Sequence, residues 1–153
     1  MVLKFVRDRF PQAIFLKIYD AATDGWGAKD FHRYCDKRGW TLTIVETTKD
    51  FIFGGFTTEQ WESPWLVLKS KRDPYSFLFI VNEGRKYPIM SVDTKAIIYH
   101  SDWSACFGWS ELGIHSVSNK NTDSYCYANY PSFKLPAAKG SEYPSITGGE
   151  FHF

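Results

Sequence analysis

Cysteine is scarce in this chain. Its three cysteines, Cys35, Cys106 and Cys126, lie far apart, and none belongs to a CxxC pair. An odd number of isolated cysteines suits neither a disulfide framework nor a zinc site. We therefore expect three free thiols, mostly buried, in a reducing compartment, and neither a metal nor another cofactor.

Long apolar runs and an excess of charge of one sign are also lacking. No stretch approaches the roughly 20 apolar residues that cross a bilayer. Charges at Lys4, Arg7 and Asp8 interrupt the N-terminal apolar pattern too early for a signal peptide, and there is no Asn-x-Ser/Thr sequon. With 18 Lys and Arg against 17 Asp and Glu, the net charge is +1, unlike that of a nucleic-acid-binding protein. These absences predict an intracellular, cytoplasmic protein without a transmembrane segment or a nucleic-acid partner.

Aromatic side chains are abundant instead. They make up 18% of the 153 residues, within an ordinary globular composition that is 44% hydrophobic and 23% charged. Aromatic residues favour β-sheets, because flat rings pack well on a pleated surface. We expect most of these rings in the core of one domain, although exposed aromatic side chains also suit binding surfaces.

The hydrophobic periodicity predicts many short strands and few helices. A short lead-in helix within residues 1–15 should end at Pro11, and a second helix should span 28–36, capped by Thr23 or Asp24 and ended by Gly39. The predicted strands cover residues 15–19, 40–46, 51–57, 77–82, 96–100, 113–117 and 124–128, and a last one starts near 151. We expect an α+β fold, an antiparallel β-sandwich of two sheets with flanking short helices.

Two adjacent glycines stand inside one of these predicted strands. Residues 40–46 and 51–57 form a predicted hairpin, and Gly54 and Gly55 interrupt its second strand. Glycine weakens a strand, because it has no side chain to pack and makes the backbone more flexible. It typically marks a bulge or a close approach by another backbone.

Four segments in sequence resemble one known family, the TLDc domain of the oxidation-resistance proteins. The segments are Lys-Ile-Tyr-Asp-Ala-Ala-Thr-Asp-Gly-Trp (17–26), Phe-His-Arg-Tyr-Cys-Asp (31–36), Phe-Gly-Gly-Phe-Thr (53–57) and Asp-Pro-Tyr-Ser-Phe-Leu-Phe (73–79). Weaker matches follow at 107–114 and 146–151, so the resemblance covers most of the chain from Phe15 onward. Trp26 and Trp40 stand where the family has Phe and Pro.

The resemblance implies a β-sandwich module of intracellular eukaryotic proteins, associated with protection against oxidative stress and with binding of the vacuolar proton ATPase. It implies a non-enzymatic protein-interaction module in one domain over residues 1–153. The family continues into a further acidic strand, which either is absent here or lies on a longer protein from which this chain is cut. An exposed sheet edge would then permit a weak strand-paired dimer beside a monomer.

The expected contact surface lies in two glycine-containing segments. One is formed by Asp24, Gly25 and Trp26, and the other by Gly54 and Gly55, because glycine permits close approach of a partner's backbone. His32, on the helix that follows Trp26, is the sixth residue assigned to this binding site.

Two alternative functions stay open at this stage. A hydrolase would use His32 and Asp36, which lie four residues apart on one helix face, with Asp24 or Cys35 nearby; a local His–Asp hydrogen bond and a buried thiol are the competing interpretation. A glycan- or small-ligand-binding sandwich would use exposed aromatic side chains. Its candidate tryptophans are Trp61, Trp65, Trp103 and Trp109.

Overall fold

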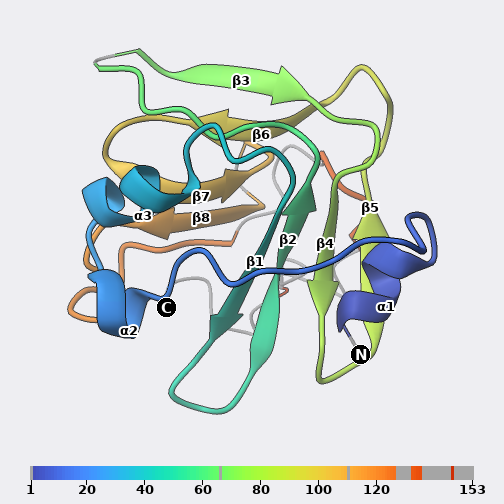
Figure 1. Cartoon of the computed structure of the whole chain (residues 1–153), viewed down its shortest axis with the longest axis horizontal. Coiled ribbons are helices and arrows are strands. Elements are labelled where there is room, and N and C mark those ends of the chain that lie inside the picture. Colours follow the sequence, from blue (N-terminus) through green and yellow to red (C-terminus); the bar gives the residue numbers. More distant parts are fainter. Residues whose placement is uncertain (1, 66, 110, 127–131, 136–145, 147–153) are drawn as a thin grey trace, which may run out of the picture.

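The computed structural model describes residues 2–65, 67–109, 111–126, 132–135 and 146. The described part holds α1 (Val2–Arg7), α2 (Ala21–Asp24), α3 (Ala28–Cys35), β1 (Thr41–Glu46), β2 (Ile52–Thr57), β3 (Lys69–Arg72), β4 (Phe77–Ile80), β5 (Arg85–Pro88), β6 (Lys95–Tyr99), β7 (Trp103–Phe107) and β8 (Leu112–His115). The strands form two antiparallel four-stranded sheets, one in the order β1-β2-β4-β5 and the other in the order β3-β6-β7-β8. The predicted α+β sandwich with short helices is therefore confirmed (Figure 1).

The main core lies between the two sheets. Large side chains from both sheets are fully buried there, among them Phe53, Leu78, Ile97 and Phe107. Trp61, from the loop after β2, joins them, with its ring edge-on to Phe107 at 5.4 Å between centroids. Burial of these aromatic and aliphatic side chains is the main source of stability, and it explains the high aromatic content.

The outer face of the first sheet has its own smaller core. Phe56, Phe77 and Phe79 point outward from β2 and β4, and Val6 of α1 is buried against them. The N-terminal segment crosses the strands of this sheet on its way to α2 (Figure 1). The sheet is thus covered on both faces, which explains why its central strands contain nearly continuous hydrophobic runs.

The predicted strand over residues 15–19 is wrong. The segment has no strand assignment: Phe15 and Tyr19 pack inward, whereas the three residues between them are exposed. Because the segment crosses the neighbouring strands instead of running along them, it cannot form a ladder of backbone hydrogen bonds (Figure 1). An alternation of apolar and polar residues in the sequence does not show whether a segment runs along a sheet or crosses it.

The predicted hairpin is confirmed. β1 pairs with β2 in a continuous antiparallel register from Thr41↔Thr57 to Glu46↔Ile52, without a bulge. The predicted strands over 77–82, 96–100 and 113–117 correspond to β4, β6 and β8 with small shifts of their ends. Of the strand predicted over 124–128, the described residues show a single bridge between Tyr125 and Gly113, and the strand predicted near 151 lies outside the described residues.

Three strands were not predicted from the sequence. β3 and β5 are edge strands rich in Lys and Arg, and such charges reduce the risk of edge-to-edge association. Pro88 at the end of β5 also fits an edge, because proline cannot donate a ladder hydrogen bond. In the sequence, β7 resembles a loop because a short turn separates it from β6. In the structure, most of β7 is buried.

A buried carboxylate stabilises the corner between β2 and β4. Asp73 is 1% exposed, and its oxygens accept hydrogen bonds from the Thr57 hydroxyl (2.8 Å), the Thr58 N–H (2.6 Å) and hydroxyl (2.8 Å), and the Tyr75 N–H (3.0 Å). Because all four groups donate, a carboxylate suits this position better than any neutral side chain.

Asp73→Asn is therefore expected to lower the free energy of unfolding by about 2 kcal/mol, because an amide N–H₂ would face donors. Urea denaturation measures the change. Asp93→Asn is the matched control: its carboxylate is exposed, pairs with Arg72 at 3.4 Å, and should change stability by less than about 0.5 kcal/mol. Equal effects of the two substitutions would contradict this role of Asp73.

Candidate functional site

Three of the predicted contact residues lie at the junction of α2 and α3: Asp24 ends α2, and Gly25 and Trp26 follow it. Asp20, and not Asp24, caps the helix that begins at Ala21, because its side chain accepts the Ala22 N–H at 3.1 Å. Asp24 instead accepts the N–H of Asp20 at 2.8 Å. The predicted cap of the second helix is therefore wrong, since two helices stand where one was expected, and Gly27 is the N-cap of α3.

Gly25 is required by the geometry of this loop. Its φ of 111° is one that side-chain-bearing residues rarely adopt, and an added Cβ would lie 2.3 Å from the carboxylate of Asp30. That carboxylate accepts the N–H of Gly27 at 3.1 Å, while the Tyr19 hydroxyl donates to the Gly25 carbonyl at 2.7 Å. The loop is thus rigidly shaped before any partner binds.

Trp26 meets a distant segment at this loop. Its carbonyl oxygen accepts the N–H of Val117 at 2.7 Å, and the two side chains are 40% and 42% exposed. Val117 has a φ of 54°, which is unfavourable for a β-branched residue. We call these two residues the Trp26–Val117 surface. The strained residue is thus hydrogen-bonded to the backbone of an exposed tryptophan.

Gly54 and Gly55 do not belong to any surface. Both are buried in β2, and an added Cβ would lie 2.0 Å from the Thr43 carbonyl oxygen at Gly54 and 2.6 Å from the Phe107 ring at Gly55. The predicted close approach by another backbone is confirmed at Gly54, whereas at Gly55 the close group is a side chain. Their assignment to a contact surface is wrong, because the approaching groups belong to the chain's own core.

His32 lies at the centre of a hydrogen-bond network. It is buried on α3, and its Nδ1 lies 2.7 Å from the Asp36 carboxylate. Its Nε2 lies 3.0 Å from the carbonyl oxygen of His100 and 2.8 Å from that of Trp103. Asp36 also accepts the Ser63 hydroxyl at 2.8 Å. We call His32, Asp36 and Ser63 the His32 network; it connects α3 to the loop after β2 and to the turn between β6 and β7.

The partners of His32 determine its charge. Carbonyl and carboxylate oxygens only accept hydrogen bonds, so both ring nitrogens carry protons. Burial disfavours the imidazolium, but the hydrogen bond and charge of Asp36 and the two carbonyl oxygens outweigh this and raise the pKa of His32. The predicted local His–Asp hydrogen bond is confirmed, as an ion pair that orients the helix.

The order of the His32 network differs from that of a catalytic triad. A triad places the imidazole between the hydroxyl and the carboxylate, so that the ring can accept the hydroxyl proton. Here Asp36 stands in the middle, and Ser63 donates to it. Cys35, the other candidate nucleophile, is buried, and burial raises the pKa of its thiol to about 12. Neither side chain is activated by this arrangement.

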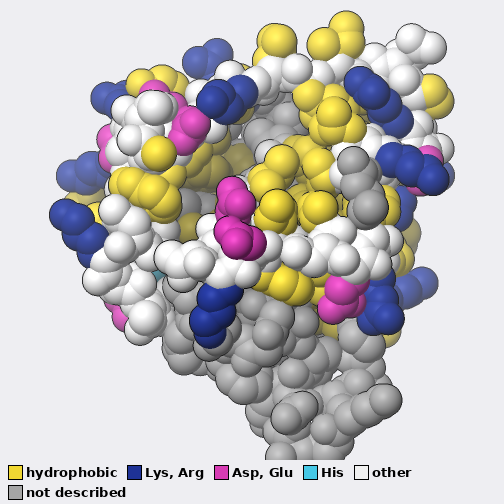
Figure 2. Space-filling model, turned by 90° about the horizontal axis from the view of Figure 1, so that it is seen from below, with side chains coloured by type: hydrophobic (Ala, Val, Ile, Leu, Met, Phe, Trp, Pro, Cys, Tyr) yellow, Lys and Arg dark blue, Asp and Glu magenta, His cyan; other side chains and the backbone are white. Residues whose placement is uncertain are grey.

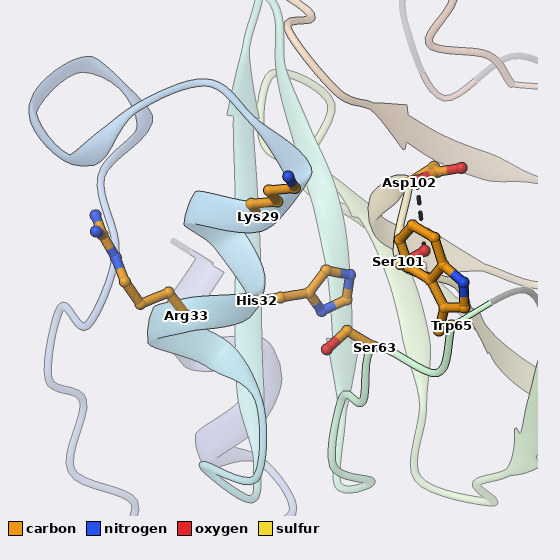
Figure 3. Close-up of a pocket in the computed structure, with 7 residues that line it drawn as sticks. All are labelled: Lys29, His32, Arg33, Ser63, Trp65, Ser101 and Asp102. Atoms are coloured by element: carbon orange, nitrogen blue, oxygen red, sulfur yellow. Dashed lines mark hydrogen bonds between the residues drawn. The ribbon is translucent and has the colours of Figure 1, made fainter.

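A hollow of about 360 Å³ lies beside the His32 network. Its walls come from α3, from the loop that follows Trp61 and from the turn between β6 and β7 (Figure 3). The lining residues are Lys29, His32, Arg33, Ser63, Trp65, Ser101 and Asp102. In Figure 3 His32 points toward the loop and the turn, whereas the guanidinium of Arg33 points away from them. Sequence patterns could not reveal the hollow, because its walls lie far apart in the chain.

The four candidate tryptophans have different positions. Trp61 is fully buried, and Trp103 lies within β7, partly buried against the rings of His100, His115 and Tyr125. Trp65 and Trp109 are exposed, and of the four only Trp65 lines the hollow. A ligand that stacks on tryptophan therefore has Trp65 as its best-placed partner.

The three cysteines are free and buried, as predicted. In the described part of the chain, no three His, Cys, Asp or Glu side chains gather as metal ligands would. None of the helices in that part combines the length and apolar character that a membrane crossing needs.

The comparisons with known proteins agree with this architecture. A search of curated proteins finds no match to this chain. Among protein-family models, that of the TLDc domain matches residues 3–150, nearly the whole chain, including the segments around Trp26, His32 and Gly54. The chain therefore belongs to the TLDc domain family.

Proposed function

We propose that this chain is a non-enzymatic protein-interaction module that contributes to oxidative-stress protection by binding the vacuolar proton ATPase inside the cell. The observation that carries the proposal is the Trp26–Val117 surface, in which a strained backbone holds two apolar side chains in solvent. Membership of the TLDc domain family supports the same function class.

The surroundings of this surface suit a protein partner. Tryptophan and arginine are enriched among the residues that dominate binding energy at interfaces. Lys29 and Arg33 are exposed on α3, the helix that follows Trp26. The Arg33 guanidinium lies 4.8 Å from the centre of the Tyr34 ring. Figure 2 shows one face of the molecule on which hydrophobic side chains gather, with acidic side chains among them and basic ones mostly toward the edges.

The rigidity of the loop favours binding without rearrangement. Gly25 has a fixed conformation, and the Trp26 carbonyl is already bonded to Val117. A surface that is ordered before binding loses less conformational entropy on association. Both ring nitrogens of His32 are engaged in hydrogen bonds with oxygen atoms of the chain itself. This supports a function in recognition rather than in proton transfer.

Trp26→Ala is expected to weaken binding to the purified vacuolar proton ATPase at least about tenfold, because an exposed tryptophan anchor is lost. The backbone hydrogen bond to Val117 is retained, so the fold should persist. Surface plasmon resonance with the immobilised chain measures the affinity.

Trp109→Ala is the matched control, since Trp109 is 50% exposed and lies outside this surface. It should bind like the unmodified chain. Equal affinity of the Trp26→Ala and Trp109→Ala variants would reject this contact surface, and absence of binding by the unmodified chain would reject the partner.

A further inference from the structure

Trp65 has an unusual environment for a tryptophan. Its side chain is 73% exposed, and among the described residues no ring contact involves it. Trp61, four residues earlier, is fully buried and packs against Phe31 and Phe107. The same loop therefore uses one tryptophan for the core and presents the other to solvent.

Hydrogen bonds and an ion pair fix the part of the loop that precedes Trp65. The Trp61 Nε1 donates to the Thr41 hydroxyl at 2.8 Å. Lys71 donates to the Gln60 carbonyl at 2.8 Å and pairs with Glu62 at 2.7 Å. Together with the bond from Ser63 to Asp36, these contacts anchor the chain just before Trp65. The Trp65 ring makes none of these contacts itself, and its face is therefore open to a ligand.

The groups around Trp65 in the hollow are polar and of both charge signs. Lys29 can donate hydrogen bonds, Asp102 can accept them, and the Ser63 and Ser101 hydroxyls can do both. Ser101 donates to Asp102 at 3.4 Å, and no ion pair involves Lys29 among the described residues (Figure 3). Two other cations also line the hollow, but His32 pairs with Asp36, and the Arg33 guanidinium pairs with Asp30 at 3.7 Å and points away from the loop and the turn (Figure 3). Lys29 and Asp102 then remain as charges of opposite sign, which favours a neutral polar ligand over an ion.

We infer that this hollow is a binding site for a neutral carbohydrate ring stacked on Trp65. The apolar C–H face of a sugar packs on an aromatic plane, while its hydroxyls need both donors and acceptors at its rim. A volume of about 360 Å³ falls within the range of small-ligand sites, about 300–1,000 Å³. The site goes beyond the proposed function and does not depend on it, since it uses neither Trp26 nor Val117.

The test uses ligand-observed NMR titration of the whole chain with neutral trisaccharides of glucose (α- and β-linked), mannose and N-acetylglucosamine, up to about 10 mM. At least one should bind saturably. Trp65→Ala should weaken this binding at least about tenfold, a change of about 1.4 kcal/mol. Trp65→Phe should retain part of it, and Trp109→Ala should leave it unchanged. Because Trp65 is exposed, each variant should keep the melting temperature of the unmodified chain.

Three results would overturn the site. The first two are absence of saturable binding by all the trisaccharides and equal binding by Trp65→Ala. The third comes from a parallel titration with glucose and glucose 6-phosphate, and is markedly tighter binding of the phosphate. The last result would show that Lys29 selects anions. None of them bears on the ATPase binding, which is measured separately with Trp26→Ala.

Discussion

Gly54→Ala is expected to lower the free energy of unfolding by about 3 kcal/mol or more, the largest effect of any substitution considered. The added methyl group would lie 2.0 Å from the Thr43 carbonyl oxygen and 2.8 Å from the Phe79 ring. A carbonyl of the paired strand cannot move aside without breaking the β1–β2 ladder. Thermal and urea unfolding of the purified variant measure the loss.

Two comparisons make this prediction specific. Gly55→Ala meets a side chain, the Phe107 ring at 2.6 Å, which can shift more easily than backbone, so its cost should be smaller. Gly39→Ala meets nothing within 4 Å and should lose only about 1 kcal/mol, because Gly39 has a φ of 80°. A Gly54→Ala variant as stable as Gly39→Ala would contradict this account of β2.

These glycines therefore cannot be used to map a binding surface. A charged side chain at Gly54 or Gly55 would enter the core, so any loss of binding would reflect unfolding. Trp26 and Val117 are the positions where a substitution tests recognition, because they are exposed.

His32→Ala is expected to lower the free energy of unfolding by about 3 kcal/mol at pH 6, because it leaves Asp36 without its ion-pair partner. The carbonyl oxygens of His100 and Trp103 also lose their donor, so the turn that forms one wall of the hollow should loosen. Denaturant titration gives the stability. Lys29→Ala, on the exposed side of the same helix, is the control and should change it by less than about 0.5 kcal/mol.

The stabilisation by His32 should depend on pH with a defined sign. Asp36 and the two carbonyl oxygens raise the pKa of His32 in the folded state above its ordinary value of 6.5. Its contribution is therefore complete below about pH 6.5 and is lost as the pH rises through the raised pKa. The stability difference between the unmodified chain and His32→Ala should shrink between pH 6 and pH 9. A difference that grows over this range would show that His32 is buried in its neutral form.

Much of the fold could be predicted from local patterns. The β1–β2 hairpin follows from alternating β-branched and aromatic residues around a polar turn, and α3 from Phe31, Tyr34 and Cys35 at helical spacing. Both patterns are local, and packing reinforces them. The family resemblance also predicted the architecture that the two sheets confirm.

The remaining features depend on contacts between distant segments. The sequence does not show that residues 15–19 cross a sheet, or that Val117 donates to the Trp26 carbonyl. The sequence also does not show whether a glycine makes room for a partner protein or, like Gly55, for a side chain of the same chain, here Phe107. The hollow beside Trp65 likewise exists only because three separate segments meet through the His32 network.

In the proposed function, the chain recognises the vacuolar proton ATPase through the Trp26–Val117 surface. Hydrogen–deuterium exchange of the chain, with and without the purified ATPase, tests it most directly, because it shows both whether and where the partner binds. We expect slower exchange from Gly25 to Ala28, where the loop enters α3, and around Val117, with little change in β4 or β5. Unchanged exchange in both segments at saturating ATPase would contradict it.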